Sequence, residues 1–429
     1  MNRLFNILQV ITKYQLDEYL SRYIKSPILN SSGNVFRKLF FIKPVNAPVG
    51  VRIKSALEDL GPVFIKFGQI LSTRHDLLSK DVAAELDSLR DKVKPFPNNL
   101  ATTIVEAELG KPLTDVFSYF SEHPVASASV AQVYLATLLT GEDVAVKILR
   151  PNIETIIKDD LQLFKYVAAT VNFVKPDLKG FNLKGIIEEL ENSILQELDL
   201  RLEAANADLF RESMIDFDYV KIPKIYHALS SSKVLVMERM YGTPIDNVNQ
   251  LTQQGIDLPS VAQQGLELLL VQIFRNRFFH ADQHSGNVWI ADDGSRIYLD
   301  FGIMGNLTRH DRDIAAKLMT TLFLQDYKGF VEVQVKAGWV PEDVDIVSLK
   351  KYYQSIGNML MKDVALSSVF QRLLTVGEKF NIKVPVQFTL LVKTLVAIEG
   401  MAKTIDPNMD LQKAARPIIM KHFSKWAKD

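Results

Sequence analysis

The chain of 429 residues contains no cysteine. Without a thiol it can form neither a disulfide nor a thiolate metal site, and it cannot use a cysteine nucleophile. Any metal ion must therefore be held by oxygen atoms or imidazole nitrogens. The absence of cysteine is compatible with a reducing cellular compartment.

The chain also lacks an excess of charge of either sign, because 50 Lys and Arg residues balance 50 Asp and Glu residues. It therefore has no overall positive field of the kind that non-specific nucleic-acid binding requires. The longest uncharged stretch, His123 to Gly141, contains serine, glutamine and threonine, so we expect no membrane-spanning helix. We expect no signal peptide, because the apolar segment near the start contains Asn6 and Gln9.

The first 54 residues are basic, with nine Lys or Arg side chains against Asp17 and Glu18. Apolar residues recur in residues 1–24 at roughly helical spacing, at Leu4, Leu8, Ile11, Tyr14 and Leu20. This pattern predicts a basic amphipathic helix, which is typical of segments that lie on an anionic membrane. The alternative is a helix that packs on its own domain and leaves its basic face to solvent.

A helical pattern over residues 55–93 is followed by Pro95 and Pro97, which cannot continue a helix. This places a boundary near Lys94 and predicts a helical extension over residues 1–94. After one further helix, two β-branched runs surround a turn that contains Gly141, which predicts a hairpin whose second strand ends near Lys147.

The remaining elements are predicted in this order: helices at about 153–174 and 183–212, strands at 222–229 and 232–240, and mainly helices from Leu258, with short strands at 287–291 and 296–302. This order predicts an α+β chain. A strand-rich small lobe with a helical insert would occupy residues 95–240, and a helical large lobe residues 241–429. A cleft between two such lobes is a natural ligand site.

One stretch of the large lobe, HADQHSGN, contains His280, Asp282, His284 and Asn287. The sequence Asp300-Phe301-Gly302 follows 13 residues after Asn287, with two strand-like segments between. An H-x-D-x-x-x-x-N loop, a β-ribbon and D-F-G are the metal and phosphate apparatus of kinases. Asp282 would orient or deprotonate the acceptor, while Asn287 and Asp300 would supply the oxygen ligands that Mg²⁺ prefers.

The same stretch has a competing interpretation, because His280, Asp282 and His284 could together bind a transition metal. The D-F-G sequence downstream favours the catalytic loop instead, in which His280 has a structural hydrogen-bonding role.

Lys147, in the sequence V-A-V-K, would contact the α- and β-phosphates of ATP, and it needs a carboxylate to position it. Glu203 is the candidate, on a helix whose buried stripe we expect to be marked by four leucines. These are Leu195, Leu198, Leu202 and Leu209. Taken alone, a glutamate on such a helix is more often a solvated surface charge.

Residues Val234 to Met240 are predicted to form a buried strand that leads into the linker between the lobes. Backbone groups around Glu238 and Met240 could there bind the adenine base. An ordinary core strand is equally compatible with this pattern.

These motifs, together with three others, resemble the UbiB family of atypical protein-kinase-like proteins, which is linked to ubiquinone biosynthesis, and especially its bacterial members. The other three are Lys66-Phe67-Gly68-Gln69, similar to the K-x-G-Q signature; Ala126-Ser127-Ala128-Ser129, where other kinases have a glycine-rich loop; and Glu197-Leu198-Asp199, similar to E-x-D, with Glu203 six residues later. The resemblance covers nearly all of the chain. It implies a bilobal protein-kinase-like fold.

In the family the K-x-G-Q helix lies over the active site and occludes the place of a protein substrate. The resemblance therefore makes Lys66, Gln69, Glu197 and Asp199 candidate active-site residues. Lys66 and Gln69 are three residues apart and share a helix face, which could also simply be exposed. Ala126, Ser127, Ala128 and Ser129 would contact the nucleotide, but a loop without glycine cannot wrap phosphates as a glycine loop does.

Residues after Gly302 are predicted to enter a helix almost at once, with Thr308 and Asp311 as a capping box, and no A-P-E sequence follows. Without a long activation segment, a peptide has no obvious place to dock. The sequence departs from the family at Ser285, where proline is usual. Bacterial members also carry two spanning helices after the kinase-like region, so the resemblance implies that this chain is truncated.

We therefore expect an Mg²⁺-dependent, ATP-binding atypical kinase or ATPase that supports ubiquinone biosynthesis at the cytoplasmic face of a bacterial inner membrane. The expected partners are membrane lipids, hydrophobic ubiquinone precursors and other proteins of that biosynthesis. One alternative is a soluble small-molecule kinase, which would share H-x-D-x-x-x-x-N but usually lacks the D-F-G glycine and K-x-G-Q. Another is a non-catalytic pseudokinase that binds nucleotide and scaffolds a biosynthetic complex.

Overall fold

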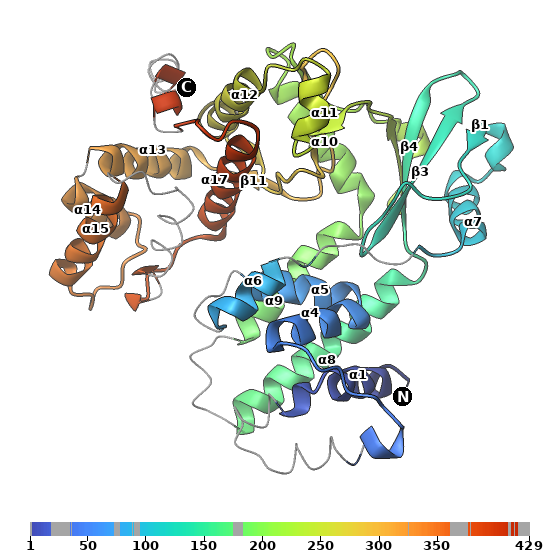
Figure 1. Ribbon diagram of the computed structural model, residues 1–429, viewed down its shortest axis with the longest axis horizontal. Coiled ribbons are helices and arrows are strands. Elements are labelled where there is room, and N and C mark those ends of the chain that lie inside the picture. Colours follow the sequence, from blue (N-terminus) through green and yellow to red (C-terminus); the bar gives the residue numbers. More distant parts are fainter. Residues whose placement is uncertain are drawn as a thin grey trace. The chain divides into compact units, whose positions relative to one another are not determined.

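The computed structural model describes residues 2–18, 35, 37–72, 78–87, 89, 95–174, 183–324, 326–360, 376–377, 379–410, 413–415 and 417–418 (Figure 1). The chain forms two compact units. Unit 1 comprises Met1–Arg201 and Tyr226–Val236, and unit 2 comprises Leu202–Ile225 and Met237–Asp429. The mixture of helices and sheets confirms the predicted α+β class.

The helices of unit 1 outside its sheet are α1 (Asn2–Lys13), α4 (Val49–Leu60), α5 (Pro62–Ser72), α6 (Lys80–Asp87), α8 (Ile153–Val174) and α9 (Leu183–Glu197). The helical pattern at 55–93 is therefore interrupted. Gly61 has a φ of +99°, a left-handed value that favours glycine, and Pro62 then starts α5 at the first helical position, where its missing N–H costs nothing. Val63, Ile65 and Leu86 are buried where these short helices pack together.

Helix α1 packs one apolar face on its own domain, as the second interpretation of the N-terminal segment proposed. Ile7, Val10 and Tyr14 are buried, and α1 lies against α4. Arg3 reaches the fully buried Asp160 of α8 in an ion pair of 2.5 Å. Leu4 and Leu8, on another face of the helix, remain exposed. Leu20 lies outside the described residues.

The sheet of unit 1 confirms the predicted hairpin. Its strands are β1 (Phe117–Phe120), β2 (Ala126–Ser127), β3 (Ala131–Leu138), β4 (Asp143–Leu149) and β6 (Val234–Glu238), in the order β1-β3-β4-β6 with β2 on β3. Strands β3 and β4 are antiparallel, and Gly141 has a φ of +96° in the turn between them. Helix α7 (Asn98–Leu109) lies beside the sheet (Figure 1). Its Ala101 and Val105 are buried against the sheet's apolar side chains.

Unit 2 contains most of α10 (Leu200–Ser213) and two small sheets. The elements are β5 (Val220–Lys221), β7 (Thr243–Pro244), α11 (Val248–Gln253), α12 (Leu258–Leu270), a π-helical turn (Val271–Asn276), β8 (Phe278–His280), β9 (Val288–Ile290), β10 (Arg296–Tyr298), β11 (Met304–Asn306), α13 (Arg309–Phe323), α14 (Tyr327–Lys336), α15 (Ile346–Leu360) and α17 (Val386–Ile405). One sheet has the order β5-β10-β9-β7, and β11 pairs with β8 in the other. No helix in the described residues has the length and apolar character of a membrane span.

The strand predicted at 222–229 is wrong over most of its length. Only a single bridge joins Ile225 to Met237, and residues 227–229 form a 3₁₀ turn. Pro223 has no N–H to donate to a ladder, which explains why β5 stops at Lys221.

The predicted leucine stripe is also wrong, because Leu195, Leu202 and Leu209 are exposed and only Leu198 is buried. The helical pattern at 183–212 breaks between Glu197 and Leu200, where α9 ends and α10 begins. The break changes which residues share a face. In α10 the buried face is made of Leu200, Glu203, Ala204, Ala207 and Phe210. Glu203 therefore lies on the buried side of its helix.

We predict that Gly305→Ala destabilises the protein by about 2 kcal/mol, because a Cβ at Gly305 would overlap the ring of Phe279, its partner in the β8–β11 ladder. The ring is completely buried. Urea unfolding of the variant and the wild type measures the change.

The control for this experiment is Gly400→Ala in α17, where an added Cβ would meet no atom within 4 Å. That change should be neutral or slightly stabilising, because alanine favours a helix over glycine. Equal stability of the Gly305 variant and the wild type would contradict the close packing of β11 on β8.

Candidate active site

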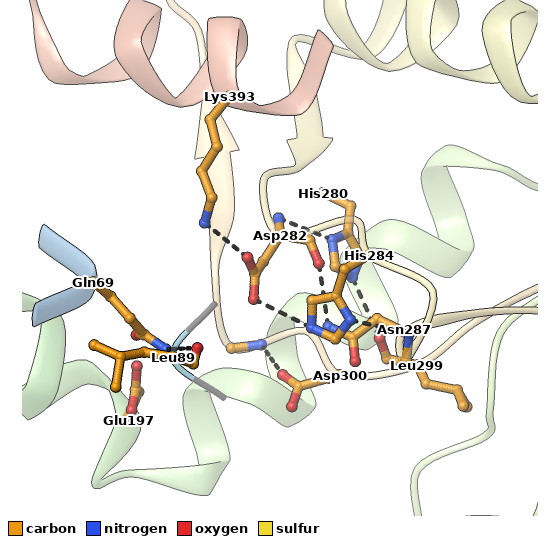
Figure 2. A network of polar contacts seen from close by, with 12 residues as sticks. Gln69, Leu89, Glu197, His280, Asp282, His284, Asn287, Leu299, Asp300 and Lys393 are labelled. Carbon is orange, nitrogen blue, oxygen red and sulfur yellow. Dashed lines mark hydrogen bonds and ion pairs between the residues drawn. The ribbon is translucent and has the colours of Figure 1, made fainter. Parts of the chain in front are cut away.

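The H-x-D-x-x-x-x-N stretch forms a loop, residues 281–287, between β8 and β9 (Figure 2). Strand β11 fixes β8 from one side, and β10 fixes β9. Within the loop, the Asn287 N–H donates to the carbonyl of His284 at 2.9 Å, and Asn287 Nδ2 donates to the carbonyl of Asp282 at 3.2 Å. These bonds turn the loop tightly, so that Asp282 and Asn287 are held on the same turn.

His280 is completely buried and has a hydrogen-bonding role. Its Nδ1 accepts from the Asp282 N–H at 3.3 Å, and its Nε2 lies 3.3 Å from the carbonyl of Leu299, to which it donates. The rings of Phe210, Tyr298 and Phe301 surround it. Burial lowers the pKa of the imidazole, so His280 is neutral at pH 7.

His284 is exposed and bonds within the loop. Its Nδ1 accepts from the Gly286 N–H at 3.0 Å, and its Nε2 is 3.8 Å from Asp282 Oδ2. In the described part of the chain, no three His, Asp or Glu side chains are grouped as metal ligands. The structure therefore gives no support to the transition-metal interpretation.

Asn287 and Asp300 lie at the same end of the β9–β10 ribbon. The ladder pairs Val288 with Tyr298, and one step further the Leu299 N–H donates to the Asn287 carbonyl at 2.8 Å. Asp300 has a φ of +58°, a rare left-handed conformation for a residue other than glycine, and its Oδ1 accepts from the Gly302 N–H at 3.0 Å.

The two side chains fit an Mg²⁺ ion by their chemistry. Because Asn287 Nδ2 is used within the loop, the amide oxygen is the atom left for a ligand, and Asp300 supplies a carboxylate. Mg²⁺ usually takes only one or two protein oxygens, and its other ligands are water and phosphate oxygens. A dedicated cage of three or more side chains is thus not required.

The D-F-G segment is anchored to α10. Asn206 Nδ2 donates to the Phe301 carbonyl at 2.9 Å, and the Phe301 ring packs against that of Phe210 at 5.7 Å between centroids. Phe301 is almost fully buried, whereas Asp300 beside it is exposed. A buried aromatic ring next to an exposed carboxylate fixes the backbone and keeps the carboxylate at the surface.

Sequence reasoning missed Lys393, which lies in α17. Its Nζ forms an ion pair of 2.8 Å with Asp282 Oδ1 (Figure 2). The two residues are 111 positions apart, and nothing in the local pattern around Lys393 distinguishes it from other helical lysines. Only the packing of α17 within unit 2 brings this positive charge to the candidate base.

In unit 1 the structure brings together two candidates, Lys66 of α5 and Glu197 of α9, in a hydrogen-bonded ion pair. Both side chains are largely buried, with 14% and 16% of their surface exposed. Gln69, on the same face of α5, donates to the Leu89 carbonyl at 3.5 Å. Asp199 pairs with Arg201, and the hydrogen bonds from that guanidinium lower the pKa of Asp199.

The segment Ala126 to Ser129 is held in place by a residue that sequence reasoning also missed. Arg150 donates to Ser127 Oγ at 2.8 Å and to the Ala128 carbonyl at 3.0 Å. The Ala128 N–H donates to the Ala131 carbonyl, which closes a tight turn, and Ser129 is buried. A flexible glycine loop would lack these restraints.

The other candidates are placed as follows. Lys147 lies half-buried on β4 of unit 1, opposite Val133 of β3. Glu203 is buried on α10 and belongs to unit 2, so its pairing with Lys147 stays a prediction. Glu238 ends β6 with an exposed side chain that accepts from the Lys224 N–H at 3.1 Å, and Met240 follows it.

Residues 88–334 match the family described as the ABC1 atypical kinase-like domain, and residues 349–410 match the UbiB helical domain. The chain belongs to the ABC1/UbiB family of atypical kinase-like proteins. Two relatives named "Probable protein kinase UbiB", from Pseudomonas putida and Pseudomonas fluorescens, are 37% and 36% identical to it. Each alignment covers all of this chain and 81% of the relative.

A solved structure, that of Rv3197 from Mycobacterium tuberculosis in complex with erythromycin, has the same fold with a TM-score of 0.56 and 21% identity. The match covers 93% of this chain and 98% of that one. The predicted family and the kinase-like fold are thus both confirmed. Lys393 lies in the region that matches the UbiB helical domain, so a part of the ABC1/UbiB chain beyond its kinase-like domain contributes a charge to the loop of residues 281–287.

We predict that the free energy of unfolding falls as the pH drops from 7.5 to 5.5, in part because of His280. Unfolded histidine has a pKa of about 6.5 and takes up a proton there, whereas the folded pKa of His280 is lower. The contribution is present above pH 6.5 and is lost below it. His280→Asn should reduce the loss between the two pH values, because asparagine cannot take up a proton when the chain unfolds.

Urea unfolding of each protein at both pH values measures the slope of the unfolding free energy with pH. This slope does not depend on how much the replacement destabilises the protein at a single pH. The same change at the exposed His123 is the control and should keep the wild-type slope. An unchanged slope in the His280 variant would mean that the protonation of His280 does not differ between the folded and the unfolded state.

Proposed function

We propose that this ABC1/UbiB chain is an Mg²⁺-dependent, ATP-binding atypical kinase or ATPase that supports ubiquinone biosynthesis at a membrane surface. It would act on a lipid-like precursor and not on proteins. The observation that carries the proposal is the arrangement of unit 2, in which one frame of paired strands holds Asp282, Asn287 and Asp300. Family membership and the kinase names of the relatives support phosphoryl chemistry in general.

Each residue would have a definite part. Asn287 and Asp300 would hold the metal ion, which neutralises phosphate charge when it is bound. Asp282 would orient the acceptor or remove its proton. Lys393, paired with Asp282, adds positive charge close to the place where a transferred phosphoryl group develops negative charge.

A small acceptor is favoured by the chain that follows D-F-G. The short strand β11 returns directly to β8, and α13 then begins at Arg309. The predicted capping box is present: Asp311 accepts from the Thr308 N–H at 2.9 Å, and the Asp311 N–H donates to Thr308 Oγ1 at 3.1 Å. Such a start leaves little chain on which a peptide substrate could be aligned.

We expect Asp300→Asn to lower Mg²⁺-dependent ATP turnover by more than about a hundredfold, because it removes the negatively charged metal ligand. Asparagine tolerates the left-handed backbone of this position, so the fold should be kept. Phosphate release from ATP, measured with the wild type and the variant at several Mg²⁺ concentrations, tests this.

The matched control is Asp293→Asn in the β9–β10 turn. Asp293 pairs with Lys221, which lowers its pKa to about 2, and it lies outside the proposed machinery. Turnover that is the same in the Asp300 variant and the wild type would disprove the assignment. A wild type that binds nucleotide but shows no turnover would favour the pseudokinase scaffold.

Support for a membrane surface comes from an exposed apolar patch near the N-terminus. It consists of Leu4, Phe5, Leu8, Leu39, Phe40 and Phe41. The rings of Phe5 and Phe40 contact edge to face at 5.0 Å, so the two segments form one surface. Lys38 and Lys43 are exposed beside it, which suits an anionic lipid headgroup region.

The outward position of Phe41 is fixed by a buried anchor. Arg37 bonds to Asp17 at 2.9 Å, to Glu18 at 2.8 Å and to the Thr12 carbonyl at 3.1 Å, close to the end of α1. Phe41 follows with a φ of +53° and has 91% of its surface exposed. No contact in the described chain explains why a bulky aromatic side chain is held exposed in this rare backbone conformation. Contact with a membrane would explain it.

Phe41→Ser should weaken binding to anionic phospholipid vesicles by about tenfold or more, because a phenylalanine contributes roughly 2 kcal/mol when it leaves water. Co-sedimentation with vesicles of anionic and of neutral lipid measures the effect. The wild type should also bind less well at high salt.

Ile215→Ser is the matched control, since Ile215 has 82% of its surface exposed but lies in unit 2. The control should bind vesicles like the wild type. If the Phe41 variant did so too, the patch would not be the membrane contact.

A further inference from the structure

One peptide group of the D-F-G segment, between Phe301 and Gly302, is hydrogen-bonded on both of its edges. Its carbonyl accepts from Asn206 Nδ2 at 2.9 Å, and its N–H donates to Asp300 Oδ1 at 3.0 Å. The C=O and N–H of a planar trans peptide point in opposite directions, so the first bond decides where the N–H points. A side chain of α10 thereby orients the donor that holds the Asp300 carboxylate.

Glycine at position 302 makes rotation of this peptide group easy, because a residue without a Cβ accepts nearly all values of φ. The chain on either side is fixed. The Phe301 ring is buried, and the Ile303 carbonyl accepts from the Ala281 N–H at 3.1 Å. A rotation can therefore be confined to the one peptide. It would turn the N–H away from Asp300, whose exposed side chain stands on a backbone in a rare left-handed conformation.

The donor stands on a well-anchored helix. Ala207 and Phe210 of α10 are completely buried, and the Phe210 ring packs against that of Phe301 at 5.7 Å between centroids. This contact keeps α10 close to D-F-G, so that Asn206 Nδ2 reaches the carbonyl. Glu203 precedes Asn206 by three positions, and one turn of α10 therefore carries both the expected partner of the phosphate-binding lysine and the anchor of D-F-G.

We infer that Asn206 is a positioning residue for Asp300. It keeps the Gly302 N–H on the Asp300 carboxylate, and so keeps that carboxylate in the orientation that binds the metal ion. The inference rests on the proposed function, in which Asn287 and Asp300 hold Mg²⁺. Without Asn206 the carboxylate has this orientation for only a fraction of the time, which lowers the affinity for the metal by the same fraction. A saturating metal concentration restores the orientation, so the maximal turnover is kept.

The test uses Mn²⁺, which can replace Mg²⁺ and is detected by electron paramagnetic resonance, with the whole chain and saturating ADP. Asn206→Leu removes the donor and nearly keeps the shape of the side chain. We expect its Kd for Mn²⁺ to rise about fivefold, as the loss of one hydrogen bond predicts. In ATP turnover the half-activating Mg²⁺ concentration should rise by a similar factor, while turnover at saturating Mg²⁺ stays within about twofold of the wild type. An unchanged Kd, or turnover that is lost even at saturating Mg²⁺, would overturn the proposal.

A second measurement needs neither metal nor nucleotide. In the protein labelled with [¹⁵N]glycine, the amide signal of Gly302 is assigned by its loss in Gly302→Ala. Its proton should resonate downfield, because it donates to a carboxylate. In Asn206→Leu the signal should move upfield as the peptide rotates. A signal that stays in place would also overturn the proposal.

Asn276→Leu is the matched control, because Asn276 Nδ2 also donates to a backbone carbonyl, that of Ser213, at 2.9 Å, and lies outside the proposed site. It should bind Mn²⁺ like the wild type. If Asn206→Leu has a lowered Tm, Asn206→Ala removes the same donor without adding apolar bulk and should give the same changes. A wild type that binds ADP but no Mn²⁺ would overturn the proposed metal site and with it the effect on metal affinity, while the glycine signal would still test whether Asn206 orients the peptide.

Discussion

The neutral, fully buried imidazole of His280 connects the two strand pairs on which the candidate active site depends. Through Nδ1 it accepts from the Asp282 N–H, and through Nε2 it donates to the carbonyl of Leu299, next to Asp300. One ring thus links the β8–β11 strand pair to the β9–β10 ribbon. Because an imidazole can donate and accept at once only when it is neutral, the low pKa that burial imposes is part of this connection.

The surroundings of His280 explain why the loop keeps one conformation. Its backbone N–H donates to Gln272 Oε1 at 3.0 Å, its carbonyl accepts from Gln283 Nε2, and aromatic rings enclose the imidazole. Every polar group of the residue is therefore bonded in an environment without water, where such bonds are strongest. Asp282 and Asp300 lie at the other side of the same segments, with access to solvent. A rigid neutral interior thus supports a charged surface.

Those parts of the structure that depend on local chemistry could be predicted from the sequence. The hairpin around Gly141, the β9–β10 ribbon and the capping box at Thr308 follow from turn residues, β-branched runs and hydrogen bonds over three positions. The parts that depend on tertiary packing could not. The leucine stripe failed because a break at residues 198 and 199 changes the helical phase, and neither Lys393 nor Arg150 lies near its partner in sequence. The candidate site could be found because kinase motifs place its residues in two short segments of the sequence, His280 to Asn287 and Asp300 to Gly302.

The Lys66–Glu197 ion pair sets the alignment of two helices more than it stabilises unit 1. Both side chains are mostly buried, so the desolvation of two charges offsets much of their attraction, and a well-packed apolar pair would hold α5 against α9 at least as well. What an ion pair provides and an apolar pair does not is direction, since a single amine and a single carboxylate fix how the two helices are aligned. Gln69 lies one turn further along the same face of α5, so the alignment that Glu197 imposes on Lys66 also sets the position of Gln69. The pair therefore accounts better for the precise presentation of the K-x-G-Q face than for the stability of unit 1.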